Sequence, residues 1–485
     1  MEVKTTVVRA LDVLVGWDEA TQQHVYHHGA DLVLRGNLVV QAGGSYEGPC
    51  DETVDGRGLM AMPGLINMHS HPSSEPGNRG LLEDLGSARL GQSSLYEYMP
   101  VFRADISSAP YGNQVAVSEM LRSGVTTYVD MSMPRPGWAD TVAATGIRGI
   151  LGPMFRSASW ATRNGHSVEY TWDEAAGERA FEASLAVVKS AMEHASGRLG
   201  AMLCPSQIDT CTPALLQAAQ AEGRRLGIPL QVHAAQSVVE FGEMTRRHGR
   251  TPIEWLDDIG LLTPQLVIGH GIFLNDHPSV YWPQADDFAL LARSGAGVAH
   301  CPTVFARRGI ALNFLGRYQQ AGIPVGIGTD TFPHNMLDEM RLASYMARVV
   351  ARNYQASSTQ GLIDAATTTA ARMLGRDDIG RLAPGCKADF SLVDLRHHYM
   401  RPAREPLRCL IYSAGDRAVR DVYVDGRQVV RNGEVLTIDV ERALFEVEQA
   451  QLSTLSRVHL NDHAGRSADK LSPKVFASST TGAAA

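Results

Sequence analysis

The chain has 485 residues, of which 44% are hydrophobic and 20% charged, and its formal net charge is −8. These values are ordinary for a soluble globular protein, and the length allows one large core with a smaller domain, or two to three domains. Lysine and arginine number 44 against 52 acidic residues and form no basic run, so we expect no nucleic acid partner. No segment approaches the roughly 20 apolar residues of a membrane span, and the N-terminus lacks a leader pattern, so we expect a cytoplasmic protein without a membrane partner.

The six cysteines are widely scattered and include no C-x-x-C pair. We therefore expect reduced thiols rather than a disulfide framework. Cys301 directly follows His300, which could suggest a nucleophile. Because free cysteine is among the most buried residue types, we interpret Cys301 as a core residue.

The middle of the chain repeats a strand followed by a helix, whereas both ends alternate in short apolar and polar runs. The end segments are typical of small antiparallel strands. In the middle we predict eight strands, and eight strand-helix units over about 270 residues match a closed parallel barrel better than an open doubly wound sheet. The predicted strands cover residues 62–71, 125–131, 147–155, 198–206, 228–234, 266–271, 296–301 and 323–330.

We therefore predict an α/β protein in which a (β/α)8 TIM-type barrel is inserted into a small β-sandwich domain built from both chain ends. The residues beyond about 455 are small, polar and without period, which is typical of a mobile tail. The predicted boundaries are 1–61 for the first part of the sandwich, 62–379 for the barrel, 380–440 for the second part, and 441–485 for a C-terminal helix with the mobile tail.

The segment MPGLINMHSHP, residues 62–72, contains the first candidate site. Side chains alternate along a strand, so His69 and His71 point the same way at its carboxyl end, where Pro72 stops the ladder. Neutral imidazole is a common metal ligand, and the pair could chelate an ion. The pattern is short, so a hydrogen-bonded pair in a loop is an equally good interpretation of these residues alone.

Four more candidates end predicted barrel strands: His233, His270, His300 and Asp330. Any one of these histidines could be a hydrogen-bonded core residue. Strand ends of a parallel barrel meet at one mouth, however, so their joint position favours a metal site. Three histidines with one carboxylate suit Zn²⁺, Fe²⁺ or Co²⁺.

Several motifs occur in an order that resembles the amidohydrolase superfamily, in particular its cytosine deaminase, guanine deaminase and triazine hydrolase (chlorohydrolase) branch. They are PGLINMHSHP, VHAA, IGHG, AHCP and GTD, followed by GRLAPGCKADFSLVDL and VYVDGRQVVRNG. The resemblance covers roughly residues 5–440. It implies a distorted β/α barrel with a flanking β-sandwich, which agrees with the prediction from the strand pattern.

The resemblance also implies roles for individual residues. The metal ligands correspond to His69, His71, His233 and Asp330, and Asp330 is also a catalytic proton acceptor. His270 corresponds to the histidine that polarises the substrate or orients the water. Two-metal members carry a lysine at the end of strand four, where this chain has MLCPSQIDT without a lysine, so we expect one divalent ion per chain, Zn²⁺ with Fe²⁺ or Co²⁺ as alternatives.

The resemblance breaks at one catalytic position. Deaminases of this branch carry a glutamate three residues after the strand-five histidine, and this chain has Gln236. An amide can hold a hydrogen bond but cannot transfer a proton near neutral pH. We interpret Gln236 as a catalytic orienter, and Glu240 and Glu243 further along as solvated helix residues.

We therefore expect a metal-dependent hydrolase that cleaves a non-peptide carbon–nitrogen bond of a small cyclic or aromatic compound. The alternatives are a hydrolytic dechlorinase, a (thio)carbamate or urea hydrolase, an amino-heterocycle deaminase with another proton shuttle, and a silent scaffold homologue. We also expect a homo-oligomer. Loops after the strands should line the pocket, and the predicted substrate contacts are Arg79, Trp138, Phe155, Trp160, Gln207, Phe305 and His334.

Overall fold

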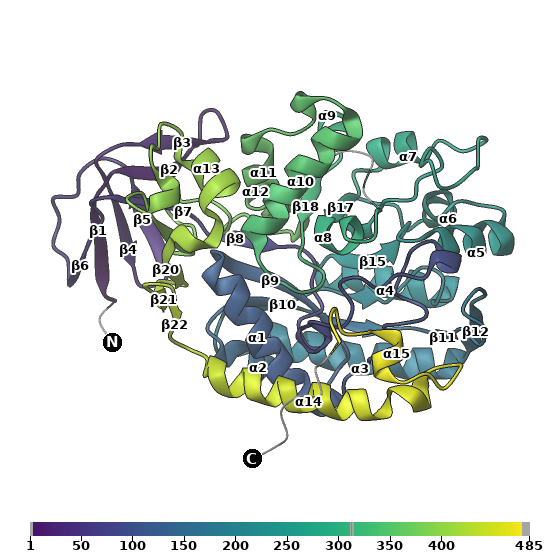
Figure 1. Ribbon diagram of the computed structural model, residues 1–485. Helices are drawn as coiled ribbons and strands as arrows, with labels where there is room; N and C mark the ends of the chain where they lie inside the picture. Colours follow the sequence, from purple (N-terminus) through teal and green to yellow (C-terminus); the bar gives the residue numbers. More distant parts are fainter. Residues whose placement is uncertain (1–2, 311, 313–314, 478–485) are drawn as a thin grey trace, which may run out of the picture.

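Parallel strands carry the central part of the chain in the computed structural model, which describes residues 3–310, 312 and 315–477 (Figure 1). Their side chains are almost all buried, as in parallel sheets covered on both faces, which confirms the predicted α/β class. The first sheet contains β8 (Leu65–Asn67), β9 (Val125–Ser132), β10 (Arg148–Phe155), β13 (Leu199–Ala201) and β14 (Cys204–Pro205), and the second contains β15 (Leu230–Ala234), β16 (Leu266–His270), β17 (Gly297–His300) and β18 (Val325–Ile327).

Backbone hydrogen bonds join these two sheets at both of their lateral edges. At one seam, Asp330 N donates to His69 O at 2.8 Å and His71 N donates to Asp330 O at 2.9 Å. At the other, Gln231 N donates to Leu203 O at 2.9 Å. The first seam places the carboxyl ends of β8 and β18 side by side, where the sequence predicted the site.

The predicted strand 62–71 is in fact two strands that belong to different sheets. β7 (Leu59–Pro63) pairs with β19 (Phe390–Asp394), and β8 pairs with β9. Gly64 separates them, and a Cβ atom at this position would lie 2.0 Å from Thr126 Oγ1. Only glycine allows this close approach. The break was not visible in the sequence because both strands are buried and equally apolar.

Helices flank the parallel strands in Figure 1. The sequence explains where they begin and end: the Thr212 side chain accepts a hydrogen bond from Leu215 N at the start of α4, and Gly227 ends it with φ of 67°. Helices between or after the strands are α1 (Ala109–Arg122), α2 (Trp138–Ala144), α3 (Glu174–Met192), α4 (Pro213–Leu226), α5 (Val238–His248), α6 (Pro252–Asp258), α7 (Asp287–Ser294), α8 (Pro302–Ala306), α9 (Leu315–Gln320), α10 (Met336–Ala351), α11 (Thr359–Ala365) and α12 (Thr368–Met373).

Two further sheets are built from the chain ends, the four-stranded one from N-terminal strands alone and the seven-stranded one from strands of both ends. A shared apolar core joins them, in which Val8 and Leu32 of one sheet pack with Leu59 and Phe390 of the other. The four-stranded sheet has the order β5 (Leu38–Ala42), β4 (Ala30–Arg35), β1 (Thr5–Leu11), β6 (Glu52–Asp55), and the seven-stranded sheet has the order β22 (Glu434–Val435), β21 (Arg427–Arg431), β20 (Val419–Val424), β19, β7, β2 (Val13–Asp18), β3 (Gln23–His27).

A buried ion pair connects the parallel strands to these terminal sheets. Arg148 on β10 donates from Nε to Asp389 Oδ2 at 2.8 Å and from Nη2 to Asp389 Oδ1 at 3.1 Å. Its Nη2 also lies 3.0 Å from Asp425 Oδ1. The side chains of Arg148 and Asp389 are 1% and 2% exposed, so neither charge has water as a substitute partner.

Arg148→Ala is therefore expected to lower the free energy of unfolding by about 3–5 kcal/mol, because Asp389 would keep an uncompensated buried charge. Denaturant unfolding of the whole chain measures the loss. The matched control is Arg57→Ala, which removes an exposed bidentate pair with Asp55 and should cost no more than about 1 kcal/mol. Equal losses in the two variants would contradict the prediction.

The C-terminal region is more ordered than the sequence predicted. α14 (Val440–Asn461) lies along α1 in Figure 1, with Ala443 and Val447 packed on Val115. After it, α15 (Ala468–Leu471) ends on the buried side chain of Leu471. The tail expected from about residue 455 thus contains a packed segment, and its apolar contacts were missed because they are single residues without period. Residues 478–485 lie outside the described range.

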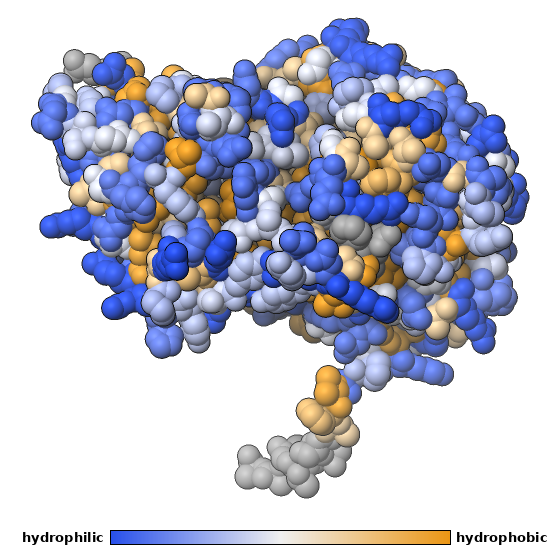
Figure 2. All heavy atoms as spheres, turned by 90° about the horizontal axis from the view of Figure 1, so that it is seen from above, coloured by the Kyte–Doolittle hydropathy of each residue, from blue (hydrophilic) through white to orange (hydrophobic). Residues whose placement is uncertain are grey.

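The surface is mainly hydrophilic on the face drawn in Figure 2, with apolar groups in small scattered patches. Among the helices of the described residues, none combines the length and apolarity needed to cross a bilayer.

Candidate functional site

Four of the predicted metal ligands converge at the carboxyl ends of β8, β15 and β18. His71 Nε2 lies 3.2 Å from His233 Nε2 and 3.4 Å from Asp330 Oδ1. His69 Nε2 lies 3.5 Å from the same Asp330 oxygen. The structure therefore brings together the residues that the sequence placed at separate strand ends.

Each of the three imidazoles is held through its other nitrogen. His71 Nδ1 donates to Met131 O at 2.8 Å, and His233 Nδ1 donates to Ser206 O. His69 Nδ1 bonds to the side-chain oxygen of Gln231. Because an oxygen acceptor fixes the proton on Nδ1, the Nε2 atoms turn their lone pairs towards the centre.

This arrangement is unfavourable without a cation. The Nε2 atoms of His71 and His233 face each other with no proton between them, and His69 Nε2 is buried without a hydrogen-bond partner. Burial lowers the pKa of His71 and lowers that of His233 further, which favours the neutral, metal-binding form. Against the effect of burial, the contact with His69 and the neighbouring imidazole of His270 hold the pKa of Asp330 well below its usual range. Three neutral nitrogens with one carboxylate fit a divalent metal ion.

His270 lies beside this group but is oriented differently. Its Nε2 is 3.9 Å from Asp330 Oδ2, its Nδ1 is buried without a partner, and its φ of 86° is unusual for a residue with a Cβ. The ring of Phe305 packs against it at 4.7 Å. Burial lowers its pKa to about 3, so the imidazole is neutral and has one N–H to donate.

Gln236 follows β15 and is 7% exposed, with its Nε2 buried and unpartnered. Glu240 is fully buried, which corrects the expectation of a solvated residue. Its carboxylate accepts hydrogen bonds from Ala235 N at 2.6 Å and Gln236 N at 3.2 Å. Glu240 therefore shapes the turn that carries Gln236, a local contact over four residues that helix spacing alone did not reveal. Glu243 pairs with arginines of the same helix, α5.

Three predicted substrate contacts are occupied by other partners. Trp138 is 1% exposed, and its Nε1 donates to Asp130 Oδ2 at 2.9 Å. Phe155 is fully buried against Phe181 of α3. The Arg79 guanidinium pairs with Glu119 of α1. For Trp138 and Phe155 the expectation is corrected, because an aromatic residue at or after the end of a strand can turn outward into the helix layer as readily as inward.

Of the other four predicted contacts, two touch site residues directly. Phe305 touches His270, and Gln207 is bridged to the His233 backbone. His334 is buried, with Nδ1 2.8 Å from Thr329 Oγ1 and Nε2 unpartnered. Trp160 belongs to a hairpin, β11 (Ala158–Ala161) and β12 (Glu169–Trp172), that the sequence pattern did not predict.

Some residues near the centre were not singled out from the sequence. Gln231 anchors His69, and its position two residues before His233 on the same strand face was the available signal. Cys301 is buried as expected, yet its Sγ also lies within 4.8 Å of ligand atoms of His69, His270 and Asp330. Burial and the Asp330 charge raise the pKa of Glu75, four residues after His71, to about 8.

Comparison with known proteins agrees with this geometry. Residues 60–429 match the Amidohydrolase family. The chain belongs to the amidohydrolase family. This amidohydrolase is therefore a metal-dependent hydrolase of carbon–nitrogen bonds other than peptide bonds, and the scaffold alternative is set aside.

Curated relatives of this amidohydrolase include two 5-methylthioadenosine/S-adenosylhomocysteine deaminases. The one from Natronomonas pharaonis is 30% identical over 412 residues, which cover 84% of this chain and 90% of the relative. The one from Pyrococcus furiosus is 29% identical over 420 residues, covering 86% and 94%. These relatives do not support the narrower resemblance to cytosine and guanine deaminases.

Solved structures of similar fold include the triazine hydrolase from Arthrobacter aurescens, with a TM-score of 0.77, 22% identity, and coverage of 92% of this amidohydrolase and 99% of that chain. An adenosine deaminase from Xanthomonas campestris with bound zinc has the same TM-score and identity, with coverage of 93% and 98%. At this identity, the likeness shows the fold, an α/β barrel domain.

Proposed function

We propose that this amidohydrolase hydrolyses a carbon–nitrogen bond of a small cyclic or aromatic compound at the centre formed by His69, His71, His233 and Asp330. The observation that carries the proposal is that the Nε2 atoms of His69 and His71 lie within 3.5 Å of the Asp330 carboxylate and that the Nε2 of His233 lies 3.2 Å from that of His71, while each Nδ1 is held by an oxygen. A single ion, Zn²⁺ in the first instance, would occupy this centre, since no lysine ends strand four.

In the proposed mechanism, a divalent ion held there would lower the pKa of a bound water from about 15.7 towards 7 and polarise the bond under attack. Asp330 accepts the proton of the attacking water. Neutral His270 donates a hydrogen bond to the negative charge that develops on the substrate. A carbon–oxygen bond forms, the carbon–nitrogen bond breaks, and the proton passes from Asp330 to the departing nitrogen.

The amide of Gln236 defines the choice between reaction types. The relatives described above are deaminases, which supports an adenosine-like amino-heterocycle as one candidate substrate. Gln236 cannot carry a proton to the ring or to the leaving amine, which favours leaving groups that need less help. We therefore keep urea, (thio)carbamate and chlorinated heterocycle hydrolysis as the second candidate.

We also propose the finer architecture that the sequence predicted. The seams between the two parallel sheets support a closed eight-stranded barrel over residues 62–379. The core shared by the two terminal sheets supports a β-sandwich built from residues 1–61 and 380–440.

The test of the proposed function combines metal analysis with a substrate panel. The purified protein is assayed with 5-methylthioadenosine, amino-heterocycles, phenylureas, carbamates and chlorotriazines, before and after chelation. We expect turnover of at least one class, its loss on chelation, and its return with Zn²⁺. Full activity after complete removal of metal would overturn the proposal.

The variant Gln236→Glu tests the role of the amide. It should add a proton shuttle and raise weak ring deamination by roughly 10²-fold or more, the usual contribution of a positioned acid or base. Against a urea, carbamate or chlorinated substrate it should help little or reduce turnover, because the new carboxylate would add negative charge to the segment after β15, where the Glu240 carboxylate is already buried. Steady-state kinetics of both substrate classes in wild type and variant decide this point.

Efficient deamination of an amino-heterocycle by the wild type would contradict the preference for other leaving groups. The matched control is Gln207→Glu, which introduces the same charge in the neighbouring loop, next to the His233 backbone, and should not give the deaminase gain.

A further inference from the structure

Residues 75–103, here called the mouth loop, follow His71 and extend over the loops that carry the site. Tyr96 OH lies 2.8 Å from Ser237 Oγ, directly after Gln236. Arg308, two residues after α8 in the segment that follows β17, donates from Nε to Leu85 O at 3.2 Å. The mouth loop therefore contacts the segments after β15 and β17, and it also packs on the segment after β18, where Phe332 shares an apolar cluster with Leu82 and Phe102.

The C-terminal segment, residues 440–477, packs against the mouth loop. Leu471 and Val458 belong to the same apolar cluster as Leu82, Phe102 and Phe332. Polar contacts add to this packing. Gln451 Nε2 donates to Gly77 O at 2.8 Å and Arg79 O at 2.9 Å, and Ser472 Oγ donates to Leu81 O at 2.9 Å.

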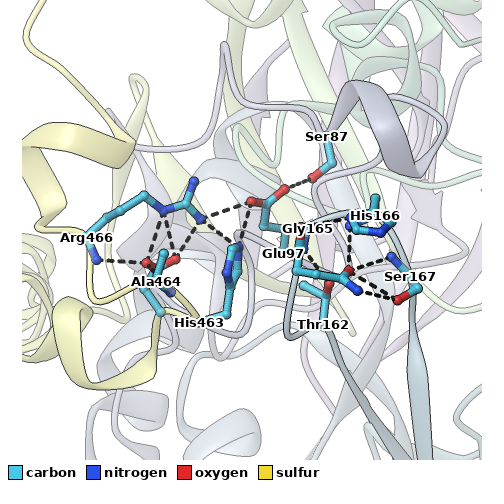
Figure 3. Close-up of polar contacts among 11 residues, drawn as sticks. Ser87, Glu97, Thr162, Gly165, His166, Ser167, His463, Ala464 and Arg466 are labelled. Carbon is cyan, nitrogen blue, oxygen red and sulfur yellow. Dashed lines mark hydrogen bonds and ion pairs between the residues drawn. The ribbon is translucent and has the colours of Figure 1, made fainter.

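One ion-pair group joins the two segments, and Figure 3 shows it. Arg466 Nη2 lies 3.0 Å from Glu97 Oε1 and 2.7 Å from Asp462 Oδ1. Ser87 Oγ donates to Glu97 Oε2 at 2.6 Å, and His463 Nε2 lies 3.4 Å from Glu97 Oε1. The Glu97 side chain is 9% exposed, so this group is better shielded from solvent than an ordinary surface pair.

The hairpin β11–β12 completes the arrangement. A Cβ atom on Gly165, at its tip, would lie 3.3 Å from Glu97 Oε1, so the hairpin packs directly against the ion-pair group. Trp160 of the same hairpin packs on Tyr96 at 5.3 Å between ring centres. Glu97 thus contacts the C-terminal segment, whereas its neighbour Tyr96 contacts the hairpin and the segment that carries Gln236.

We propose that Arg466 and Glu97 are positioning residues, through which the C-terminal segment fixes Tyr96 and the mouth loop over the site. The packed loop would exclude water from the substrate and would hold Ser237, the N-cap residue of α5, in place. The kinetic part of the test below rests on the proposed function, and the hydrogen-exchange part does not.

Arg466→Ala is expected to speed amide hydrogen exchange in residues 79–103 by roughly ten- to a hundredfold. The variant loses a charge-assisted hydrogen bond, and local opening of these residues becomes easier by the corresponding free energy. Exchange in β9 and β16 should not change. The matched control is Arg457→Ala, which removes an arginine of α14 whose Nε donates to Ser453 O of the same helix at 3.3 Å. Equal exchange of the mouth loop in both variants, or faster exchange throughout the chain, would overturn the proposal.

With an identified substrate, Arg466→Ala should lower kcat/KM by about 10- to 100-fold, mainly through KM, without loss of metal. Glu97→Gln should have a similar effect, and the double variant should lose less than the sum of the two single losses, because both substitutions break the same Arg466–Glu97 ion pair. Arg466→Lys should restore part of kcat/KM by keeping the charge. Additive losses in the double variant, or unchanged kinetics in both single variants, would show that the contact does not position the loop for catalysis.

Discussion

Asp330→Ala is expected to give a folded protein that holds almost no divalent metal and has no measurable hydrolytic activity. The carboxylate lies 3.4 Å from His71 Nε2 and 3.5 Å from His69 Nε2, so its loss removes both a metal ligand and the negative charge that these imidazoles face at the centre. It also removes the proposed proton acceptor. Elemental analysis after dialysis, together with thermal unfolding, measures metal content and folding separately.

His300→Asn is the matched control for that experiment. His300 ends β17 and is buried, yet it lies outside the cluster of Nε2 atoms that forms the centre. The variant should keep about one ion per chain. Two ions per chain in the wild type, or full metal content in Asp330→Ala, would contradict the assignment of a single centre.

Gln231→Ala tests the residue that anchors His69. It should weaken metal affinity by about 10- to 100-fold, the usual effect of removing a ligand's anchoring partner.

His270→Ala is expected to lower turnover by about 10² to 10⁴ while metal content stays near normal. The size follows from the usual contribution of one positioned acid, base or oxyanion-stabilising group. The structure supports this separation, because His270 Nε2 is 3.9 Å from Asp330 Oδ2 and its Nδ1 has no anchor. Steady-state kinetics on the metal-loaded enzyme measure the loss.

Phe305→Leu is the control for His270→Ala, since it changes only the ring that packs on the imidazole. It should reduce turnover much less than the histidine variant. If His270→Ala lost the metal instead, His270 would be a ligand and the centre would need a different description.

The convergence of the four candidate metal ligands was predictable because each is preceded by a short apolar strand. His233 follows Leu230 and Val232, and Asp330 follows Val325–Ile327 after Gly328 and Thr329. A parallel sheet aligns such strand ends without any information about loops. The strand pattern alone is therefore enough to bring these four side chains to one edge of the sheet.

Loop residues were predicted less well, because their direction depends on packing across the chain. Trp138 was expected in the pocket, but its Nε1 donates a hydrogen bond to the buried carboxylate of Asp130 on β9, which turns the side chain away from the pocket. Glu240 looked solvated because its contacts are to backbone N–H groups, which leave no mark in the sequence pattern. The C-terminal contacts of Arg466 with Glu97 join residues with no shared motif.

The position of β7 also has a consequence for biosynthesis. Residue 63 pairs with residue 390, while the other neighbour of β7, β2, lies only some 45 residues upstream. When His69 and His71 have been translated, the apolar edge of β7 is therefore still unpaired, because its partner strand β19 lies more than 300 residues further along the chain. An unpaired apolar strand edge is a site of mispairing between nascent chains.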